Sequence, residues 1–328
     1  MVDEKIGVLL VNLGSPTAPT VPAVRKFLKE FLGDKRVVNI PRFVWLPILH
    51  GFILPFRPKK SLKAYAKIWD VEKGSPLTFL THQLTSKLAT KLTSQNIVVD
   101  CAMSYGEPSI PNQLRKFKEQ GVTEIIVLPL YPQYSSTTTA SVYDALIKEL
   151  KALWHLPSFR FISDYHQNER YISALAESIE AAWREKPKNE LLIMSFHGLP
   201  EMLTKKGDPY FYQCQKTAQL LADKLGLQEN EWRLVFQSRF GKAEWLKPYC
   251  VDTLQVLPKE GVKNVDVVCP GFAVDCLETL EETAMENKKI FHEAGGENYR
   301  YIPALNDSDS NVEVMLDILN LENFKETK

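Results

Sequence analysis

The sequence predicts an α/β protein of two similar domains, each a parallel sheet flanked by helices, with a cleft between them. Apolar runs typical of buried strands alternate with helical patterns along the chain. The length of 328 residues exceeds the usual size of one domain. Strand-to-turn segments of the first half also recur, in the same order, in the second half. We therefore expect domains at residues 1–162 and 163–328, and chain order leaves open on which of them the last helix, 311–320, packs.

The first half is expected to begin with a strand at residues 6–13, a continuous apolar run that ends at Gly14. Two more buried strands are predicted at residues 97–103 and 124–129. The helices expected between the strands lie at residues 21–32, 61–69, 77–94 and 111–120. This alternation of strands and helices is typical of a parallel sheet.

The second half repeats this plan. Three pairs of segments match, namely 11–16 with 195–200, 103–106 with 237–241, and 121–129 with 261–270. Because buried parallel strands resemble one another in composition, the repeat does not by itself prove a duplication. Ligands of open α/β sheets bind beyond the carboxyl ends of the strands, and those ends carry the distinctive residues of both halves. We therefore expect the functional site in the cleft between the halves.

The composition is that of a globular protein, with 45% hydrophobic and 24% charged residues. A net charge of +0 implies no general attraction to nucleic acid. Five cysteines without a CxxC pair indicate a reducing compartment and no disulfides. Residues 1–5 run directly into the first strand without the features of a signal peptide, so we expect a cytoplasmic protein.

The longest apolar segment, residues 43–56, is interrupted by prolines and is shorter than the ~20 residues of a membrane-spanning helix. Arg57, Lys59 and Lys60 follow it. One interpretation is a helix buried in the core. The other is an exposed apolar lip that admits a large flat ligand and rests on an anionic membrane surface. Both interpretations can hold for different residues of the segment.

Residues 265–284 form the most distinctive stretch, in which an apolar strand leads into a helix with an acidic face. In an α-helical projection Asp275, Glu278 and Glu282 share one face. The opposite face would carry Leu277, Leu280 and Ala284. Such an acidic row is ordinarily a solvated surface. Desolvation and mutual repulsion are expected to raise the pKa of at least one of the three carboxyl groups.

A histidine, His197, ends the predicted strand 191–197 and is followed by Gly198, which allows a sharp turn. A histidine in this position is often a structural hydrogen-bond donor. Together with the acidic row, it suits a reaction that exchanges protons for a metal ion. No HExxH motif or cysteine cluster indicates a closed metal site. An open, transient site of His197 and Glu278 would suit Fe²⁺ or Zn²⁺.

Other catalytic motifs are weak. Gly14 is a lone glycine outside any GxGxxG or Walker loop, so we expect no nucleotide. The hydroxyl run 135–139 either cradles an anion or begins a helix. No GxSxG motif supports a serine hydrolase.

Several ordered motifs resemble those of ferrochelatases over essentially the whole chain. They are residues 128–135, 195–200 with 206–210 behind it, 238–241 and 275–280. The resemblance implies two Rossmann-like, chelatase-type domains that clasp a porphyrin. It also implies a lyase that inserts Fe²⁺ into protoporphyrin IX, with removal of two pyrrole protons, in the last step of haem biosynthesis.

The resemblance also implies roles for single residues. His197 matches the catalytic histidine of the family and Glu278 its partner carboxylate, so both are expected to take protons or contact the metal. Asp275 and Glu282 match the acidic path that leads away from them. The porphyrin pocket is expected to include Leu13, Tyr105, Tyr134, Ser135 and Phe240. Residues 43–56 correspond to the membrane-facing porphyrin entrance of the family, and residues 43–60 are expected to contact the inner membrane surface peripherally.

The chain departs from some relatives in two places. Cys276 stands where animal enzymes have a histidine, which puts a metal-ligand role of that position in doubt. Residues 323–328 contain no cysteine, so we expect no C-terminal iron–sulfur cluster and no permanently bound cofactor. Three alternative functions stay open: a chelatase for another tetrapyrrole, a tetrapyrrole or iron carrier, and a sugar-nucleotide transferase.

Overall fold

The computed structural model describes residues 5–93, 96–241 and 243–321, and the chain divides into two compact units. The first unit comprises the described residues up to Tyr131, then Ser135–Asp164, then those from Met315 onward. The second comprises Pro132–Tyr134 and Tyr165–Val314. The structure divides the chain after Asp164, whereas the boundary expected from the sequence lies after residue 162. The end of the predicted helix at Ser94 and the segment 323–328 lie outside the described residues.

The first unit is built on a four-stranded parallel sheet with the strand order β2-β1-β3-β4. Its strands are β1 (Ile6–Asn12), β2 (Ile97–Met103), β3 (Glu124–Pro129) and β4 (Ser158–Phe161). In the register of the sheet Val8 lies beside Val99 on one side and Ile126 on the other. The central strands β1 and β3 are buried almost throughout, as continuous apolar runs of parallel strands require.

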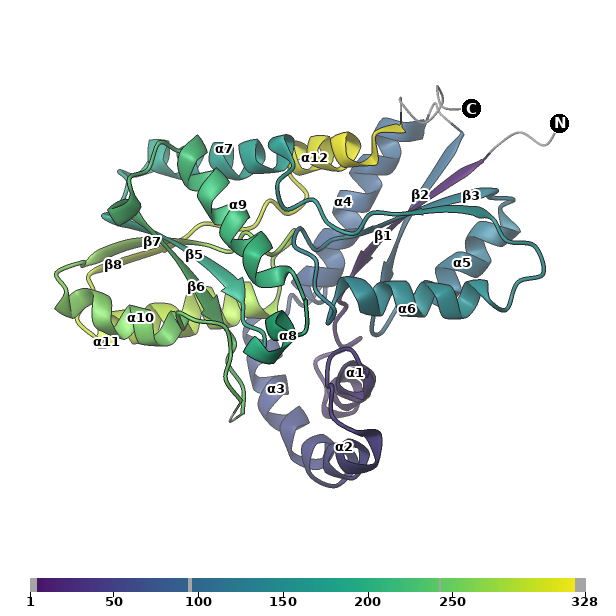
Figure 1. The fold of residues 1–328 in the computed structure, drawn as a ribbon, viewed down its shortest axis with the longest axis horizontal. Coiled ribbons are helices and arrows are strands. Elements are labelled where there is room, and N and C mark those ends of the chain that lie inside the picture. The colour runs from purple at the N-terminus through teal and green to yellow at the C-terminus, as the bar shows by residue number, and fades with distance from the viewer. Residues whose placement is uncertain (1–4, 94–95, 242, 322–328) are drawn as a thin grey trace. The chain divides into compact units, whose positions relative to one another are not determined.

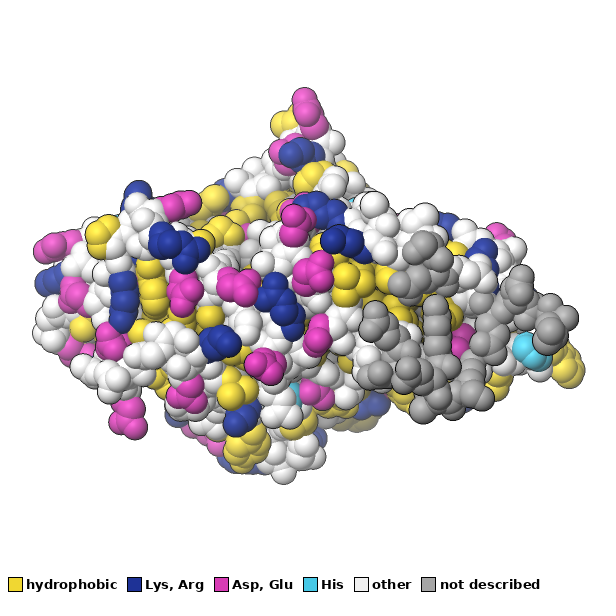
Figure 2. All heavy atoms as spheres, turned by 90° about the horizontal axis from the view of Figure 1, so that it is seen from above, with side chains coloured by type: hydrophobic (Ala, Val, Ile, Leu, Met, Phe, Trp, Pro, Cys, Tyr) yellow, Lys and Arg dark blue, Asp and Glu magenta, His cyan; other side chains and the backbone are white. Residues whose placement is uncertain are grey.

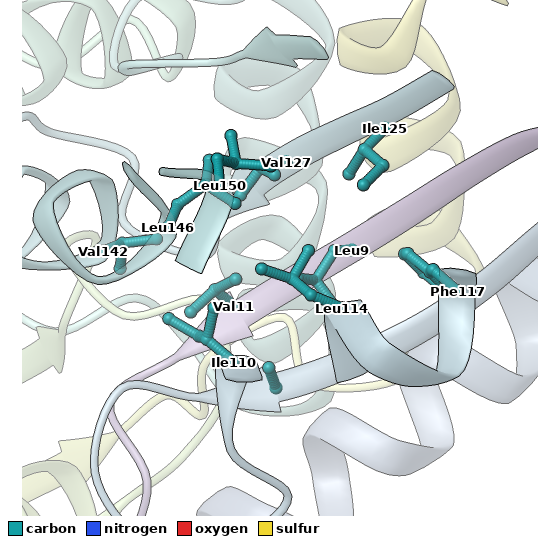
Figure 3. Packing of buried hydrophobic residues seen from close by; sticks show 11 residues of the cluster. Leu9, Val11, Ile110, Leu114, Phe117, Ile125, Val127, Val142, Leu146 and Leu150 are labelled. Carbon is teal, nitrogen blue, oxygen red and sulfur yellow. The ribbon is translucent and has the colours of Figure 1, made fainter. Parts of the chain in front are cut away.

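Helices cover both faces of this sheet (Figure 1). Those of the unit are α1 (Val21–Gly33), α4 (Pro76–Leu92), α5 (Ile110–Glu119) and α6 (Thr139–Leu150). One core cluster joins α5 and α6 to the face of the sheet that carries Leu9 and Val11, and Phe117 lies in it without exposure to solvent (Figure 3). The side chains of Val8 and Leu10 alternate to the other face.

The apolar segment 43–56 lies in a run of three short helices, α2 (Arg42–Ile48), the π-helix η1 (Leu49–Ile53) and α3 (Leu54–Ile68). Trp45 is buried, and its indole N–H donates to the carbonyl of Leu32 in α1 at 2.7 Å. By contrast Phe43, Phe52 and Phe56 are 81%, 68% and 72% exposed. The segment therefore has one buried face and one exposed apolar face. Among the described residues no helix is long and apolar enough to cross a membrane.

The second unit has a sheet of the same order, β6-β5-β7-β8, again parallel throughout. Its strands are β5 (Leu191–His197), β6 (Trp232–Gln237), β7 (Asn264–Val268) and β8 (Asn298–Tyr301). The three matched segment pairs of the sequence occupy equivalent strands, so the predicted repeat of two α/β halves is confirmed. Strands β4 and β8 were not predicted, because each is a four-residue edge strand with mixed polar and aromatic side chains.

Helices flank this second sheet on both faces as well (Figure 1). They are α7 (Glu169–Glu185), α8 (Glu201–Lys205), α9 (Tyr210–Lys224), η3 (Glu229–Glu231), α10 (Cys250–Val256), η4 (Leu257–Lys259), the π-helix η5 (Glu278–Asn287) and α11 (Lys288–Glu293). The last helix, α12 (Asp309–Leu319), begins in the second unit and ends in the first. Arg160 in β4 donates to the carbonyl of Leu319 at 2.9 Å, which ties the end of α12 to the first unit.

Charged side chains of both signs are interspersed over the face drawn in Figure 2, in keeping with the net charge of +0. No large area of one sign is visible on that face.

Candidate active site

His197 is the last residue of β5 and is half-buried. Its backbone carbonyl accepts a hydrogen bond from the hydroxyl of Tyr210 at 3.0 Å, and its ring lies edge-on to Phe272 at 6.5 Å between centroids. The N–H of Gly198 donates to the carbonyl of Gln237 at 2.8 Å. A Cβ atom at Gly198 would lie 2.5 Å from that carbonyl oxygen, so only glycine fits where the chain leaves the sheet beside His197.

Glu278 and Glu282 lie on η5, which is wound as a π-helix. The wider turn of a π-helix brings residues four apart close to one line, and such turns are frequent at functional sites. Glu286, the next residue in this series, extends the row and is exposed. The charge of Glu278 acts on the pKa of both His197 and Glu282, and Glu286 acts on that of Glu282. The four side chains therefore form one electrostatically connected series within the second unit.

The environment changes the proton affinities of two members of this series. Burial lowers the pKa of His197, and the negative charge of Glu278 opposes that effect in part. Burial raises the pKa of Glu282 to about 7, despite hydrogen bonds from Ser238 and with further increases from Glu278 and Glu286. The elevated pKa of one carboxyl group agrees with the sequence-based expectation. At neutral pH the imidazole of His197 is thus mainly unprotonated and can accept a proton, while the carboxyl group of Glu282 can both donate and accept one.

The predicted placement of Asp275 on the acidic helical face is wrong. Asp275 precedes η5, is 4% exposed, and accepts hydrogen bonds from three side chains. These donors are Thr279 at 2.9 Å and Tyr301 at 2.6 Å to Oδ1, and Asn306 at 2.8 Å to Oδ2. A projection of about 100° per residue assumes an α-helix that already includes Asp275, whereas here the helix starts later and is wound differently. The hydrogen-bonded carboxylate of Asp275 holds the segment that leads into η5 in place.

The buried side of η5 also differs from the predicted one. Leu277, Leu280 and Ala284 are only half-buried. Thr279, Thr283 and Asn287 are buried instead, each bonded to a polar partner. Tyr299 in β8 donates to the backbone carbonyl of Thr283 at 2.7 Å. The helix therefore packs through hydrogen bonds, which a pattern of apolar residues does not reveal.

Three further residues of the site were not found by sequence reasoning. Ser238 donates to Glu282 through its backbone N–H at 2.7 Å and through its hydroxyl. The side chain of Gln237 donates to the carbonyl of Glu278 at 3.1 Å. The thiol of Cys276 donates to Oε2 of Glu278 at 3.1 Å. The motif 237–241 identified Gln237 and Ser238 as a strand end. Their contacts, however, are made with a helix some 40 residues later in the chain.

The other predicted pocket residues divide between the units. Tyr134 and the 55% exposed Phe240 belong to the second unit. In the first unit the N–H of Tyr105 donates to the carbonyl of Leu13 at 3.0 Å, and its hydroxyl donates to Asp34 at 2.8 Å. Burial raises the pKa of Tyr105.

Ser135 also belongs to the first unit, and its hydroxyl oxygen accepts from the N–H of Thr137 at 3.1 Å. The first hydroxyl of the run 135–139 thus serves a turn before α6, whereas Thr138, the N-cap residue of α6, makes no side-chain capping hydrogen bond.

The side chains of His197, Glu278 and Glu282 are of types that can exchange protons. Within the described part of the chain, no cluster of three or more His, Cys, Asp or Glu side chains is placed to hold a metal ion. His197 and Glu278 offer one nitrogen and one carboxylate, a pair of ligands that suits passage of a divalent cation better than its retention.

Comparisons with known proteins agree on one family. The family model "Ferrochelatase" matches residues 5–322. A ferrochelatase of Methylococcus capsulatus is 52% identical over 315 residues, covering 96% of both chains. A ferrochelatase of Vibrio cholerae is 48% identical over 319 residues, covering 97% of this chain and 98% of its own.

Solved structures show a similar fold at low sequence identity. SirB from Bacillus subtilis, solved with Fe³⁺, has a TM-score of 0.54 at 13% identity and covers 97% of this chain and 98% of its own. CbiX, described as the terminal enzyme of sirohaem biosynthesis in denitrifying bacteria, has a TM-score of 0.54 at 12% identity, covering 96% and 98%. The two-domain chelatase-type fold is confirmed by these likenesses.

Proposed function

The chain belongs to the ferrochelatase family, enzymes that insert iron into protoporphyrin in haem biosynthesis, and we propose that His197 and Glu278 carry the chemistry. Porphyrin and iron are its substrates. The reaction forms bonds from Fe²⁺ to the pyrrole nitrogens and releases two protons from the free-base ring. The observation that supports the assignment is that Gln237, the neighbour of His197 in the sheet, donates to the carbonyl of Glu278 at 3.1 Å, so both residues adjoin the carboxyl ends of β5 and β6.

His197 is proposed to accept the pyrrole protons. Its lowered pKa keeps the imidazole neutral near pH 7, so its ring nitrogen has a free lone pair for an N–H proton. A nearby negative charge stabilises the imidazolium that forms, and Glu278 supplies it. A histidine with a strongly raised pKa would already carry a proton and would be unable to act in this way.

Glu278 is proposed to contact the incoming Fe²⁺, and Glu282 with Glu286 to pass protons or cations to solvent. Glu282 suits proton relay because its pKa of about 7 makes both protonation states accessible at neutral pH. Glu286 is exposed and would complete the series at the surface. Asp275 is left out of this path, since its carboxylate accepts from Thr279, Tyr301 and Asn306.

The site assignment is tested by anaerobic turnover with Fe²⁺ and protoporphyrin IX, following the loss of the free-base absorption spectrum. His197→Ala and Glu278→Gln are each expected to lower kcat by at least about 100-fold. The same assay with coproporphyrin in place of protoporphyrin IX compares the turnover of the two porphyrins. Wild-type turnover in both variants would refute the assignment.

We also propose that the exposed face of residues 43–60 contacts an anionic membrane surface. Phe43, Phe52 and Phe56 are largely exposed, and Lys59 and Lys60 follow them on the exposed side of α3. Exposed aromatic side chains beside lysines combine apolar insertion with attraction to lipid phosphates. Cosedimentation with vesicles containing phosphatidylserine is expected, and serine in place of the three phenylalanines should abolish it. Equal binding of that variant would contradict the proposal.

No cofactor takes part in the proposed reaction, because iron enters as a substrate. The five cysteines are buried free thiols distributed over both units. We therefore propose that the protein carries no iron–sulfur cluster, which iron analysis of the purified protein would test.

A further inference from the structure

Gln237 occupies a position between the two halves of the proposed catalytic pair. It is the last residue of β6, is 2% exposed, and lies directly beside His197 in the register of the sheet. Its backbone carbonyl accepts from Gly198, the residue that turns the chain away from the sheet after His197. Its side chain reaches in the other direction, to η5.

The side-chain amide of Gln237 is buried and hydrogen-bonded at both its nitrogen and its oxygen. Its Nε2 donates to the backbone carbonyl of Glu278 at 3.1 Å. Its Oε1 accepts from the hydroxyls of Ser195 at 2.6 Å and Thr283 at 3.1 Å, and from the thiol of Cys269 at 3.6 Å. Because a carbonyl oxygen can only accept, the hydroxyl donors place Oε1 beside Ser195 and Thr283 and leave Nε2 to donate to Glu278.

Glu278, whose carbonyl accepts the hydrogen bond from Gln237, is the first residue of η5. The hydroxyl of Thr283 lies 3.0 Å from the same carbonyl and has one proton to give, either to this carbonyl or to Oε1 of Gln237. The neighbour of Gln237, Ser238, binds the carboxylate of Glu282 one turn further along. Ser238 has a φ angle of 65°, a left-handed conformation that few residues other than glycine adopt and that aims its N–H at Glu282.

From these contacts we propose that Gln237 is a positioning residue that sets the separation between His197 and Glu278. The inference rests on the function proposed above for that pair. In this proposal Gln237 acts through Glu278 and not on a substrate. It acts by tying the start of the π-helix to the strand end that carries His197.

The test replaces the amide in two ways. Gln237→Met keeps the length of the side chain and removes donor and acceptor, while Gln237→Asn keeps the amide and shortens its reach by one methylene. A displacement of about 1 Å at a catalytic group can cost up to about 100-fold in rate, so we expect kcat to fall at least tenfold with the KM values of both substrates unchanged. In a Glu278→Gln background, Gln237→Met should change kcat less than twofold, because a residue that acts through Glu278 has little left to act upon.

Gln113 provides a matched control in the first unit. It is 7% exposed, and its amide donates to the carbonyl of Cys101 at 2.7 Å and to Asp100 at 3.0 Å. Gln113→Met removes a comparable buried amide, so its kcat should stay within twofold of wild type.

Four results would overturn the inference. They are a wild-type kcat in either Gln237 variant, a rise in KM at constant kcat, a similar loss of kcat in Gln113→Met, and losses that multiply in the Glu278→Gln background. Wild-type turnover of His197→Ala and Glu278→Gln would instead overturn the proposed function, and the inference with it.

Discussion

Glu282 is expected to make the second unit less stable as the pH rises through neutrality. Its pKa is about 7 in the folded protein against an ordinary value of 4.5. Between these values the folded state holds a proton that the unfolded state has released, so the free energy of unfolding falls with rising pH. A difference of this size corresponds to about 3 kcal/mol, and partial exposure of the side chain reduces the expected loss to about 2 kcal/mol between pH 4.5 and pH 8.

Glu282→Gln removes the titrating group and keeps an oxygen that can accept from Ser238. Denaturant unfolding of wild type and variant at pH 5, 6, 7 and 8 is the assay, read on the transition of the second unit. We expect the stability of the variant relative to wild type to increase by about 2 kcal/mol from pH 5 to pH 8. Glu286→Gln is the matched control, because it removes the same charge from an exposed position on the same helix. A difference between Glu282→Gln and wild type that is independent of pH, or equal to that of the control, would refute the reasoning.

Three further substitutions test contacts around the site. Gly198→Ala places a Cβ 2.5 Å from the carbonyl of Gln237, so it should destabilise by about 1–3 kcal/mol in denaturant unfolding and lower kcat; wild-type behaviour would show that the turn can relax. Asp275→Asn weakens the hydrogen bonds at the start of η5 and is expected to cost about 1–3 kcal/mol by the same measurement, whereas an unchanged midpoint would contradict the role assigned to Asp275. Arg300→Met leaves Asp266, which is 1% exposed, without its positively charged partner at 2.6 Å, while Trp183 and Asn189 still donate to it; a loss of about 3 kcal/mol in unfolding free energy is expected, and a loss below 1 kcal/mol would speak against a buried pair.

Local patterns in the sequence determined the α/β fold class and the ends of the central strands. β2 and β3 begin and end at the predicted residues, and β5 ends at His197 as expected. A strand buried on both faces requires apolar residues along its whole length, so its signal is local and can be detected without knowledge of the partner strands. The repeat of three strand ends likewise indicated two similar halves, and the common strand order of the two sheets agrees with it.

The tertiary structure alone decided how η5 is wound and what it buries. The acids of the row were identified from their spacing. Asp275 does not belong to it, because its carboxylate accepts hydrogen bonds from Tyr301 and Asn306. The contacts of Gln237 join a strand to a helix that begins 41 residues later. Such contacts depend on which polar groups meet when the elements pack, and a buried polar group must be satisfied by whatever partner the fold supplies. Spacing along one helix cannot encode a partner from another element, and for that reason the geometry around Glu278 came only from the folded chain.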